Sequence, residues 1–356
     1  AAAAYRLAAR EAQVTLIDQA EPGSGTSSTS FAWLNANNKA PAAYHALNVD
    51  GIAAHSRLGA DLGGAAWLHL TGNLRCASGA AAAELGKQVE ALQTLAYPVQ
   101  RIDRQRAQEL EPQVRWPSGV DVAFTHFPQE GWADGPLLVQ TLVGAAQSLG
   151  AIVRAGDGVT ALELAGDRAT AVRLASGARL NADAVVLAAG RWSDRVAALA
   201  GLRLPLAPTC GLLAITAPLL HGPRGVVHAP GVHFRPEGGG RVVLQDDDTD
   251  ALVEPATPRD PDLPACRELW RRAAAYLPEL AGVRIVEARV GIRALPADGY
   301  SVVGFAPGVA NLYLAVTHSG MTLGPLLGEL VAAELLDGAR DARLATFRPD
   351  RCVVPC

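Results

Sequence analysis

The stretch VTLIDQAEPGSGTSSTS, residues 14–30, determines the fold class. It begins as a short apolar run that ends in the carboxylate of Asp18, and it continues as a segment rich in glycine, serine and threonine that is typical of a loop. The Ala-rich segment before it, residues 1–13, predicts a helix. A helix followed by a strand with an acidic end is typical of dinucleotide-binding folds, where the carboxylate binds a ribose hydroxyl pair. A carboxylate at a strand end is also a common surface group, so Asp18 needs support from other parts of the chain.

The segments that follow predict alternating helices and strands. Apolar residues recur at helical spacing over residues 43–62 and 80–95, and PLLVQTLVGAAQSLG, residues 136–150, predicts a helix that ends at its glycine. Residues 151–190 alternate apolar and polar side chains with turns at regular distances, which predicts a β-meander that leads into a buried strand. Residues 99–131 mix charge, proline and aromatics and predict short strands and loops of a second domain.

The last third of the chain predicts an anion-binding helix start. The short strands SVVG and LYLAV, residues 301–304 and 312–316, precede THSGMT, residues 317–322, and then a long apolar-periodic helix. A strand that enters a helix in this way leaves backbone N–H groups free in the first turn, where they favour negative charge.

Composition excludes several classes of protein. The 356 residues are 49% hydrophobic with a formal net charge of -4, so the chain can bury a large core and offers no general attraction for polyanions. Gln, Glu, Arg or Asp interrupts every candidate stretch, so no apolar run reaches the roughly 18 residues that a spanning helix needs. We therefore expect neither a nucleic-acid partner nor an integral membrane segment, and we read the Ala-rich start as a helix and not as a signal peptide.

Cysteines and acidic residues predict neither disulfides nor a metal site. The five cysteines are an odd number without a C-x-x-C pair, which favours free thiols and a reducing, cytoplasmic location. The acidic run DDDTD, residues 246–250, has no complementary ligand set nearby in the sequence, so we expect a solvated loop there.

Several motifs together resemble the D-amino-acid oxidase and glycine oxidase family of FAD-dependent oxidoreductases. They occur in the family's order and extend over nearly the whole chain: VTLIDQAEPGSGTSSTS, GWADGPLLVQTLVGAAQSLGA (131–151), ADAVVLAAGRWSDRVA (182–197), IRALPADGYSVVGFAPG (292–308) and LYLAVTHSGMTLGPLLGELVAAELL (312–336). The G-x-G-x-x-G turn that related sequences carry before the first helix is absent. By this resemblance, the first strand and its glycine turn are expected to precede Ala1, so the sequence is expected to begin late.

The resemblance implies a cofactor site assembled from separate segments. It makes Asp18 the ligand of the adenosine ribose and Val159 the backbone contact of adenine. The pyrophosphate and the flavin would lie beside the other implied residues, which are Ser27, Ser28, Thr29, Ala189, Gly190, Gly320, Met321 and Thr322. Relatives that link the flavin covalently carry a cysteine soon after the equivalent of Arg293, and none is present here before the end of the final helix, so FAD is expected to be non-covalent.

The resemblance also implies the substrate residues. Arg293 aligns with the arginine that holds a substrate carboxylate in this family, a role that suits a planar guanidinium, although an Arg in a structural ion pair is the alternative. His318 either faces the flavin or the substrate or is a hydrogen-bonded structural residue. Trp33, Asn35 and Asn37 follow the flavin-proximal loop and either line the active site or belong to the core.

The expected fold class is α/β, with a Rossmann-like FAD-binding domain and a second α+β substrate domain of mixed sheet. The FAD-binding domain is predicted over 1–45, 132–205 and 291–350, and the substrate domain over 46–131 and 206–290. The expected reaction is oxidation of the C–N bond of a small amine or amino acid by hydride transfer to flavin, with oxygen or a quinone as the electron acceptor. The alternatives are a flavoenzyme that acts on a hydroxy acid or a modified nucleoside side chain, and a non-catalytic member.

Overall fold

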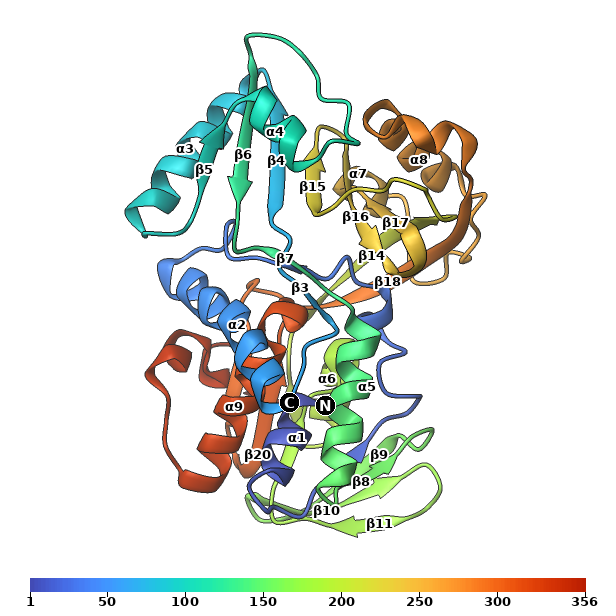
Figure 1. Cartoon of the computed structure of the whole chain (residues 1–356). Helices are drawn as coiled ribbons and strands as arrows, with labels where there is room; N and C mark the ends of the chain where they lie inside the picture. Colours follow the sequence, from blue (N-terminus) through green and yellow to red (C-terminus); the bar gives the residue numbers. More distant parts are fainter.

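The computed structural model describes residues 1–356 apart from the side chain of Pro208. Its elements gather into two lobes (Figure 1). One lobe contains the first and last helices of the chain with several small sheets, and the other contains a long mixed sheet with the helices α3, α4, α7 and α8. This α/β architecture confirms the predicted fold class.

The first lobe begins with the helix and strand that the sequence predicts. Helix α1 (Ala2–Ala8) is followed by β1 (Thr15–Ile17), which pairs in parallel with β8 (Ile152–Arg154). Helix α5 (Gly135–Ser148) packs against α1. Asp134 caps α5 by accepting a 3.0 Å hydrogen bond from the Leu137 amide, and the proline at the first turn suits that position.

The meander and the closing strands form two further sheets. Strands β9 (Val159–Ala165), β10 (Arg168–Leu174) and β11 (Arg179–Asn181) are antiparallel. Strand β12 (Val185–Leu187) pairs in parallel with β20 (Val309–Val316), whose other neighbour is the antiparallel β19 (Val302–Ala306). The chain then enters α9 as predicted.

Helix α9 (Gly320–Asp337) is the central element of this lobe. It packs against both α1 and α2 (Ala42–Asp61) through close backbone approaches. A methyl group on Gly328 would lie 2.8 Å from Ala2, and one on Gly51 would lie 2.7 Å from the Thr322 carbonyl oxygen. These glycines allow three helices to meet where larger side chains would separate them.

The second lobe is built on one long sheet in the order β18-β14-β17-β16-β15-β4-β6-β5. Its strands are β18 (Ile285–Pro296), β14 (Leu206–Thr216), β17 (Arg241–Gln245), β16 (Val232–Glu237), β15 (Val226–Ala229), β4 (Asn73–Ser78), β6 (Val122–Phe127) and β5 (Gln100–Ile102). The β15–β4 pair is parallel and its other pairs are antiparallel, which makes the sheet mixed as predicted.

The two faces of this sheet differ in chemistry. Alternate residues such as Leu74, Phe234 and Leu244 form a buried core with helix α8 (Pro264–Tyr276) on one face. The residues between them, including Arg75 and His233, lie on the opposite face. We call this the polar face of the sheet.

The remaining elements are short or cover the sheets. Helix α3 (Ala80–Thr94) packs on β4 and β6. The others are α4 (Arg104–Leu110), α6 (Ser193–Ala198), α7 (Asp247–Asp250), β2 (Trp33–Leu34), β3 (Leu68–His69), β7 (Gly131–Ala133), β13 (Leu202–Arg203), β21 (Val354–Pro355) and the 3-10 turns η1 (Thr26–Thr29), η2 (Gly190–Trp192), η3 (Gly238–Gly240), η4 (Pro278–Gly282), η5 (Ala342–Phe347) and η6 (Pro349–Arg351).

The acidic run at residues 246–250 is not the solvated loop that we predicted. Residues 247–250 form the short helix α7, and both Asp246 and Asp250 are buried. The five cysteines are free thiols, as predicted. Among the described residues, no helix is long and apolar enough to cross a bilayer, and no group of three or more His, Cys, Asp or Glu side chains is placed to hold a metal ion.

Candidate active site

The turn η1 lies where the two lobes meet. A methyl group on Gly135 at the start of α5 would overlap the Ser27 carbonyl oxygen and lie 3.1 Å from the Met321 sulfur. One on Gly291 in β18 would overlap the Thr29 hydroxyl. Glycine is therefore required at both positions. The turn η1 contacts α5 and β18, and the start of α5 in turn approaches Met321 in the first turn of α9. Segments that are far apart in the sequence converge here, as the resemblance implied.

The three predicted hydroxyl residues of η1 differ in their roles. Ser28 Oγ donates to the Gly25 carbonyl oxygen at 2.9 Å, and Thr29 is packed against Gly291. Both side chains therefore shape the turn itself. The Ser27 hydroxyl makes no hydrogen bond within the described part of the chain, so it is the one of the three that is free to bind a ligand.

Asp18 and Val159 also lie together. The Asp18 carbonyl oxygen accepts from the Asp157 amide at 3.1 Å, and the neighbouring Gly158 approaches Gln19, where a methyl group would lie 3.0 Å from the Gln19 Cβ. One oxygen of the Asp18 carboxylate accepts from the Ala20 amide at 3.0 Å. The end of β1 and the start of β9 thus form one surface, as a site for the adenosine half of a dinucleotide requires.

The predicted turn at Ala189 and Gly190 faces the same region. It leads into η2, whose Trp192 ring lies beside Gly25 of the loop before η1, where a methyl group would be 3.7 Å from the ring. A methyl group on Gly190 would meet open space, and one on Gly320 would touch only the Thr317 methyl group at 3.9 Å. Both backbones are therefore open to close approach by a ligand.

Hydrogen bonds from neighbouring segments fix the first turn of α9 in place. Trp67 Nε1 donates to His55 Nδ1 at 3.3 Å, which fixes the proton on His55 Nε2, and this atom donates to the Met321 carbonyl oxygen at 2.8 Å. Burial lowers the pKa of His55 to about 4, so it is neutral. The Thr322 side chain is buried and donates to the Trp33 carbonyl oxygen at 3.4 Å.

These contacts leave the amide end of α9 available. Ser319, the residue before the helix, provides no side-chain cap, and the first N–H groups of a helix have no partners inside it. Its hydroxyl is instead bonded to the Tyr44 hydroxyl at 2.8 Å. The start of α9 therefore has the free donors and the helix dipole that stabilise a negative charge. The open glycine backbones, the free Ser27 hydroxyl and this helix start are consistent with a bound dinucleotide such as FAD.

Arg293 lies on the polar face of the sheet and makes an ion pair. Its guanidinium donates to the Asp250 carboxylate and, at 2.7 Å, to the Cys210 carbonyl oxygen. Asp250 also accepts from the Leu212 amide at 2.7 Å and from Gln245 at 2.9 Å. Burial raises the pKa of Asp250, and the charge of Arg293 opposes that shift. The buried end of the acidic run is therefore the partner that orients Arg293.

The ion pair leaves part of Arg293 free. A guanidinium has five N–H donors in a planar fork, and these contacts account for two of them. The Arg293 side chain is 31% exposed, against 6% for Asp250. Its free edge can still bind a carboxylate with two hydrogen bonds.

His318 lies near Arg293 with an exposed side chain. It makes no side-chain hydrogen bond within the described part of the chain. Even so, the surrounding protein desolvates it and, together with the charges of Lys39 and Arg293, lowers its pKa to about 4. His318 is thus a neutral imidazole whose pKa is affected by two cations, and the structural role that the sequence left open finds no supporting contact.

A buried carboxylate, Glu130, organises the loop that contains Trp33, Asn35 and Asn37. Its Oε2 accepts from Trp33 Nε1 at 3.1 Å, Asn37 Nδ2 at 2.9 Å and Asn73 Nδ2 at 2.9 Å, and its Oε1 accepts from the Tyr97 hydroxyl at 2.7 Å. Burial raises the pKa of Glu130 to about 7, although these hydrogen bonds oppose the shift. The sequence motifs gave no sign of this residue.

Glu130 also fixes the tautomer of His228 on the polar face. Because Asn73 donates its amide N–H to Glu130, its amide oxygen must accept from His228 Nδ1, at 2.8 Å. The His228 ring packs against the Trp33 ring in a tilted arrangement, with 4.1 Å between ring centroids. Burial, followed by the proximity of His233 and Arg75, keeps the pKa of His228 well below its ordinary value. Its Nε2 is therefore an unprotonated acceptor.

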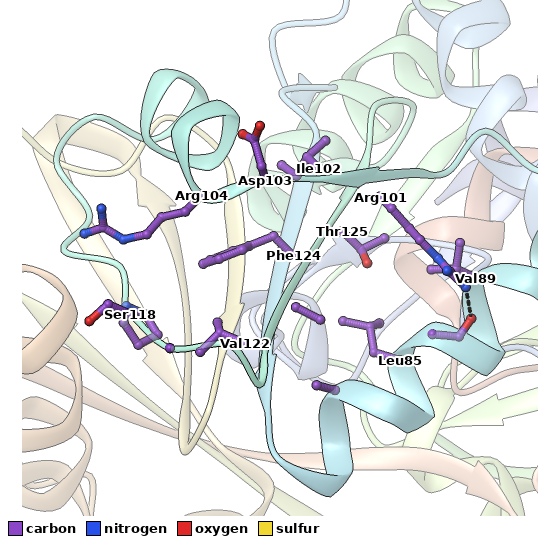
Figure 2. Close-up of a pocket in the computed structure, with 15 residues that line it drawn as sticks. Leu85, Val89, Arg101, Ile102, Asp103, Arg104, Ser118, Val122, Phe124 and Thr125 are labelled. Atoms are coloured by element: carbon purple, nitrogen blue, oxygen red, sulfur yellow. Dashed lines mark hydrogen bonds between the residues drawn. The ribbon is translucent and has the colours of Figure 1, made fainter.

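A separate cavity of about 490 Å³ lies in the second lobe (Figure 2). Its walls come from α3, β5, β6 and the loop before β6, and they include Leu85, Arg101 and Phe124. Arg101 donates to the Gly86 carbonyl oxygen at 2.9 Å and pairs with Glu90. None of the predicted site residues lines this cavity, and we assign it no part in the reaction.

Comparisons with known proteins agree with these features. The model of a family described as FAD dependent oxidoreductase matches residues 1–334. Glycine oxidase of Geobacillus kaustophilus (strain HTA426) is 27% identical over 348 residues, which are 93% of this chain and 89% of that protein.

Two solved structures show the same fold over nearly their whole length. The crystal structure of glycine oxidase from Geobacillus kaustophilus superposes with a TM-score of 0.86 and 25% identity, covering 98% of this chain and 94% of that one. The crystal structure of iminodiacetate oxidase from Chelativorans sp. BNC1 gives a TM-score of 0.80 with 25% identity, covering 98% and 95%.

Proposed function

The chain belongs to the family of FAD-dependent oxidoreductases that includes D-amino-acid oxidase and glycine oxidase, and on this basis we propose that it oxidises the C–N bond of a small amine that carries a carboxylate. The substrate class is a D-amino acid, glycine or an N-alkyl glycine. The names of two relatives, glycine oxidase and iminodiacetate oxidase, support this class, because both glycine and iminodiacetate are amines with carboxylates.

The family is FAD-dependent, so FAD is the cofactor. We propose that it is held without a covalent bond by Asp18 and Val159 at the adenosine end, by Ser27 and the backbone of η1 and Ala189–Gly190 in the middle, and by Gly320–Thr322 at the flavin end. FAD supplies the hydride acceptor. The free amides of α9 stabilise the negative charge that accompanies reduction of the ring.

The observation that carries the proposal is the position of Arg293. It lies on β18, two residues after Gly291, which contacts η1. Its positive charge helps to lower the pKa of His318, which lies two residues before the start of α9. Its free guanidinium edge binds the substrate carboxylate and so positions the α-carbon. Asp250 and the Cys210 carbonyl oxygen hold the guanidinium in place.

Neutral groups complete the proposed site. His318 is uncharged at neutral pH and makes no competing hydrogen bond in the described structure, so it can bond to the substrate without repelling an ammonium group. Trp33 forms an apolar wall between the start of α9 and His228. After hydride loss, the imine product hydrolyses in water to a keto acid and an amine or ammonia.

The test of the proposal is the variant Arg293→Lys in the FAD-loaded protein. Lysine keeps the charge but loses the planar two-bond contact, so we expect the KM for the best amino-acid substrate to rise about 10- to 100-fold. Keto acid and ammonia or amine are measured as products, and hydrogen peroxide distinguishes oxygen from a quinone as the acceptor.

The control is Arg101→Lys, which changes an arginine that lines the separate cavity of the second lobe and should leave KM unchanged. An unchanged KM in Arg293→Lys would contradict the carboxylate role. An unmodified protein that oxidises no amine but does oxidise a hydroxy acid or a modified nucleoside side chain would favour that substrate instead.

A further inference from the structure

The side chain of Gln245 has an amide oxygen without a partner. Gln245 is the last residue of β17 and is buried, with 7% of its surface exposed. Its amide nitrogen donates to Asp250 Oδ2 at 2.9 Å and to Asp247 Oδ1 at 3.2 Å, which uses both of its N–H groups. The reverse amide orientation would place the oxygen against two carboxylates, so these bonds fix Oε1 as an acceptor. This oxygen accepts no hydrogen bond within the described part of the chain.

The Gln245 oxygen is also accessible. The side-chain atoms that are both buried and unpartnered in the described structure include Asn35 Oδ1, Asn37 Oδ1 and His233 Nδ1, but they do not include Gln245 Oε1. Polar atoms of buried side chains are as a rule hydrogen-bonded, either within the protein or to water. An accessible acceptor on a buried side chain therefore indicates a position where water or a bound molecule supplies the donor.

Arg293 binds the same carboxylate oxygen as Gln245. A methyl group on Gly211 in β14 would lie 2.9 Å from an Arg293 guanidinium nitrogen, so the guanidinium lies across β14, the strand between β18 and β17. There it donates to Asp250 Oδ2, the oxygen that also accepts from Gln245. Two donors on one oxygen lie within about 6 Å of each other. The guanidinium and the Gln245 amide are thus neighbours on the polar face of the sheet.

The charges beside Gln245 favour a cation. His233 faces Gln245 in the strand register. Burial lowers the pKa of His233, and the charges of Asp246 and Asp247 oppose that shift, so the negative potential of the acidic run extends over this part of the polar face. A carboxylate at the free edge of Arg293 and an ammonium group at Gln245 would each meet an environment of the opposite charge.

We propose that Gln245 is a specificity-determining residue, whose amide oxygen accepts a hydrogen bond from the amino group of the substrate while Arg293 binds the carboxylate. This inference deepens the proposed function and rests on it. In an α-amino acid a single carbon separates the two groups, which suits two side chains that share one carboxylate oxygen. A carboxylic acid without a donor at that carbon would leave Oε1 unpaired and so bind more weakly.

The test compares two ligands of the same shape. 2-Aminoisobutyrate has an amino group where pivalate has a methyl group, and each carries one carboxylate. Neither has a hydrogen on the α-carbon, so hydride transfer cannot consume them. Each is titrated into the FAD-loaded protein, and the change in the flavin absorption bands gives Kd. We expect 2-aminoisobutyrate to bind at least about 10-fold more tightly, because it adds a hydrogen bond from a charged donor.

The variant Gln245→Met removes the acceptor and nearly preserves the length of the side chain. We expect it to weaken 2-aminoisobutyrate about 10- to 100-fold and pivalate less than about 3-fold. If Gln245 only supported Asp250 and Arg293, both ligands would lose affinity by the same factor. The ratio of the two Kd values therefore distinguishes a contact with the amino group from a structural role.

Two further variants serve as comparisons. Asp250→Asn loosens the Arg293 guanidinium and should weaken both ligands by a similar factor. Gln140→Met, on the exposed face of α5, is the matched control and should leave both Kd values unchanged. Glycine and propionate form a smaller pair of the same kind, so the KM of glycine and the Ki of propionate should show the same ratio in Gln245→Met.

The outcomes separate this inference from the proposed function. Equal affinity for the two ligands in the unmodified protein, or equal losses for both in Gln245→Met, would overturn the role of Gln245. If an amine still reduces the flavin in that case, and Arg293→Lys raises its KM, the proposed function stands. If glycine reduces the flavin but neither larger ligand perturbs its bands, the glycine and propionate pair decides by the same criterion. If no amine reduces the flavin and no ligand perturbs its bands, both proposals fail.

Discussion

The candidate site has a cofactor side and a substrate side, and the two use different chemical groups. The cofactor side consists of glycines, short turns and a helix start, and its segments approach each other closely at glycines, as at Gly135 and Gly291. The substrate side consists of charged and polar side chains, such as Arg293, Asp250 and Glu130, on the sheet and the loops packed against it. On the proposed function, the backbone contacts would bind the cofactor that the family shares, whereas the individual side chains would select the substrate.

This difference implies two kinds of sensitivity to mutation. Changes on the cofactor side should act through steric overlap and so affect folding and FAD content together. Changes on the substrate side should act through charge and hydrogen bonding, so they should depend on pH or on the ligand. Substitutions on each side of the site, together with one outside both, can distinguish these two kinds of sensitivity to mutation.

The largest effect is expected for Gly135→Ala on the cofactor side. The new methyl group would overlap the Ser27 carbonyl oxygen and crowd Met321, so η1 or α5 has to move. We expect a loss of about 3 kcal/mol in the free energy of unfolding and a lower ratio of FAD to protein. Chemical unfolding and the absorbance ratio of the purified protein measure the two quantities.

Gly144→Ala is the matched control in the same helix. A methyl group there has no neighbour within 4 Å, and alanine favours a helix, so this variant should gain about 0.5–1 kcal/mol. If Gly135→Ala is as stable as Gly144→Ala and keeps its FAD, the cofactor side does not depend on close backbone contact.

A smaller and pH-dependent effect is expected at Glu130 on the substrate side. Because its folded pKa is raised from 4.5 to about 7, the native state binds the proton more tightly than the unfolded chain. The free energy of unfolding should therefore fall as the pH rises from about 4.5 to 7, by at most roughly 3 kcal/mol from this group.

Glu130→Gln should remove that pH dependence. The amide oxygen can accept from Trp33, Asn37 and Asn73, and the amide nitrogen can donate to the Tyr97 hydroxyl, so the site remains satisfied. Denaturant unfolding at pH 5 and pH 8 compares the two proteins. An unchanged slope with pH in the variant would show that Glu130 is not the titrating group.

The smallest effect is expected for Arg101→Gln, outside both sides of the site. Arg101 and Glu90 form an ion pair with side chains that are 55% and 69% exposed, and such pairs contribute about 0–1 kcal/mol. We expect a change within about 0.5 kcal/mol in thermal unfolding, with no change in FAD content. A larger loss of stability would mean that the Arg101–Glu90 ion pair is stronger than its exposure implies.

Most of the residues that we propose for the cofactor side could be named from the sequence. Asp18, Ser27, Gly190 and Gly320 stand in short contiguous motifs, and local patterns also predicted the helices and strands that position them. The structure refined one point, because the Ser28 and Thr29 hydroxyls are used within η1 and only Ser27 is free among the three.

The substrate side was harder to predict because its residues are isolated in the sequence. Glu130, Arg75 and His228 are single polar residues in or beside strands, and sheet pairing alone brings them together. The acidic run at 246–250 was interpreted wrongly because the partner of Asp250 is Arg293, 43 positions further along the chain. Alternation of polar and apolar residues around Arg75 was the one local signal of an inward polar face.

The most direct test of the proposed chemistry is an anaerobic titration of the FAD-loaded protein with glycine, sarcosine, D-amino acids and iminodiacetate, followed by visible absorption. We predict that the oxidised flavin bands bleach with at least one of these carboxylate-bearing amines. Flavin bands that persist with every compound would contradict the proposed substrate class, and a protein that binds no FAD would contradict the cofactor site itself.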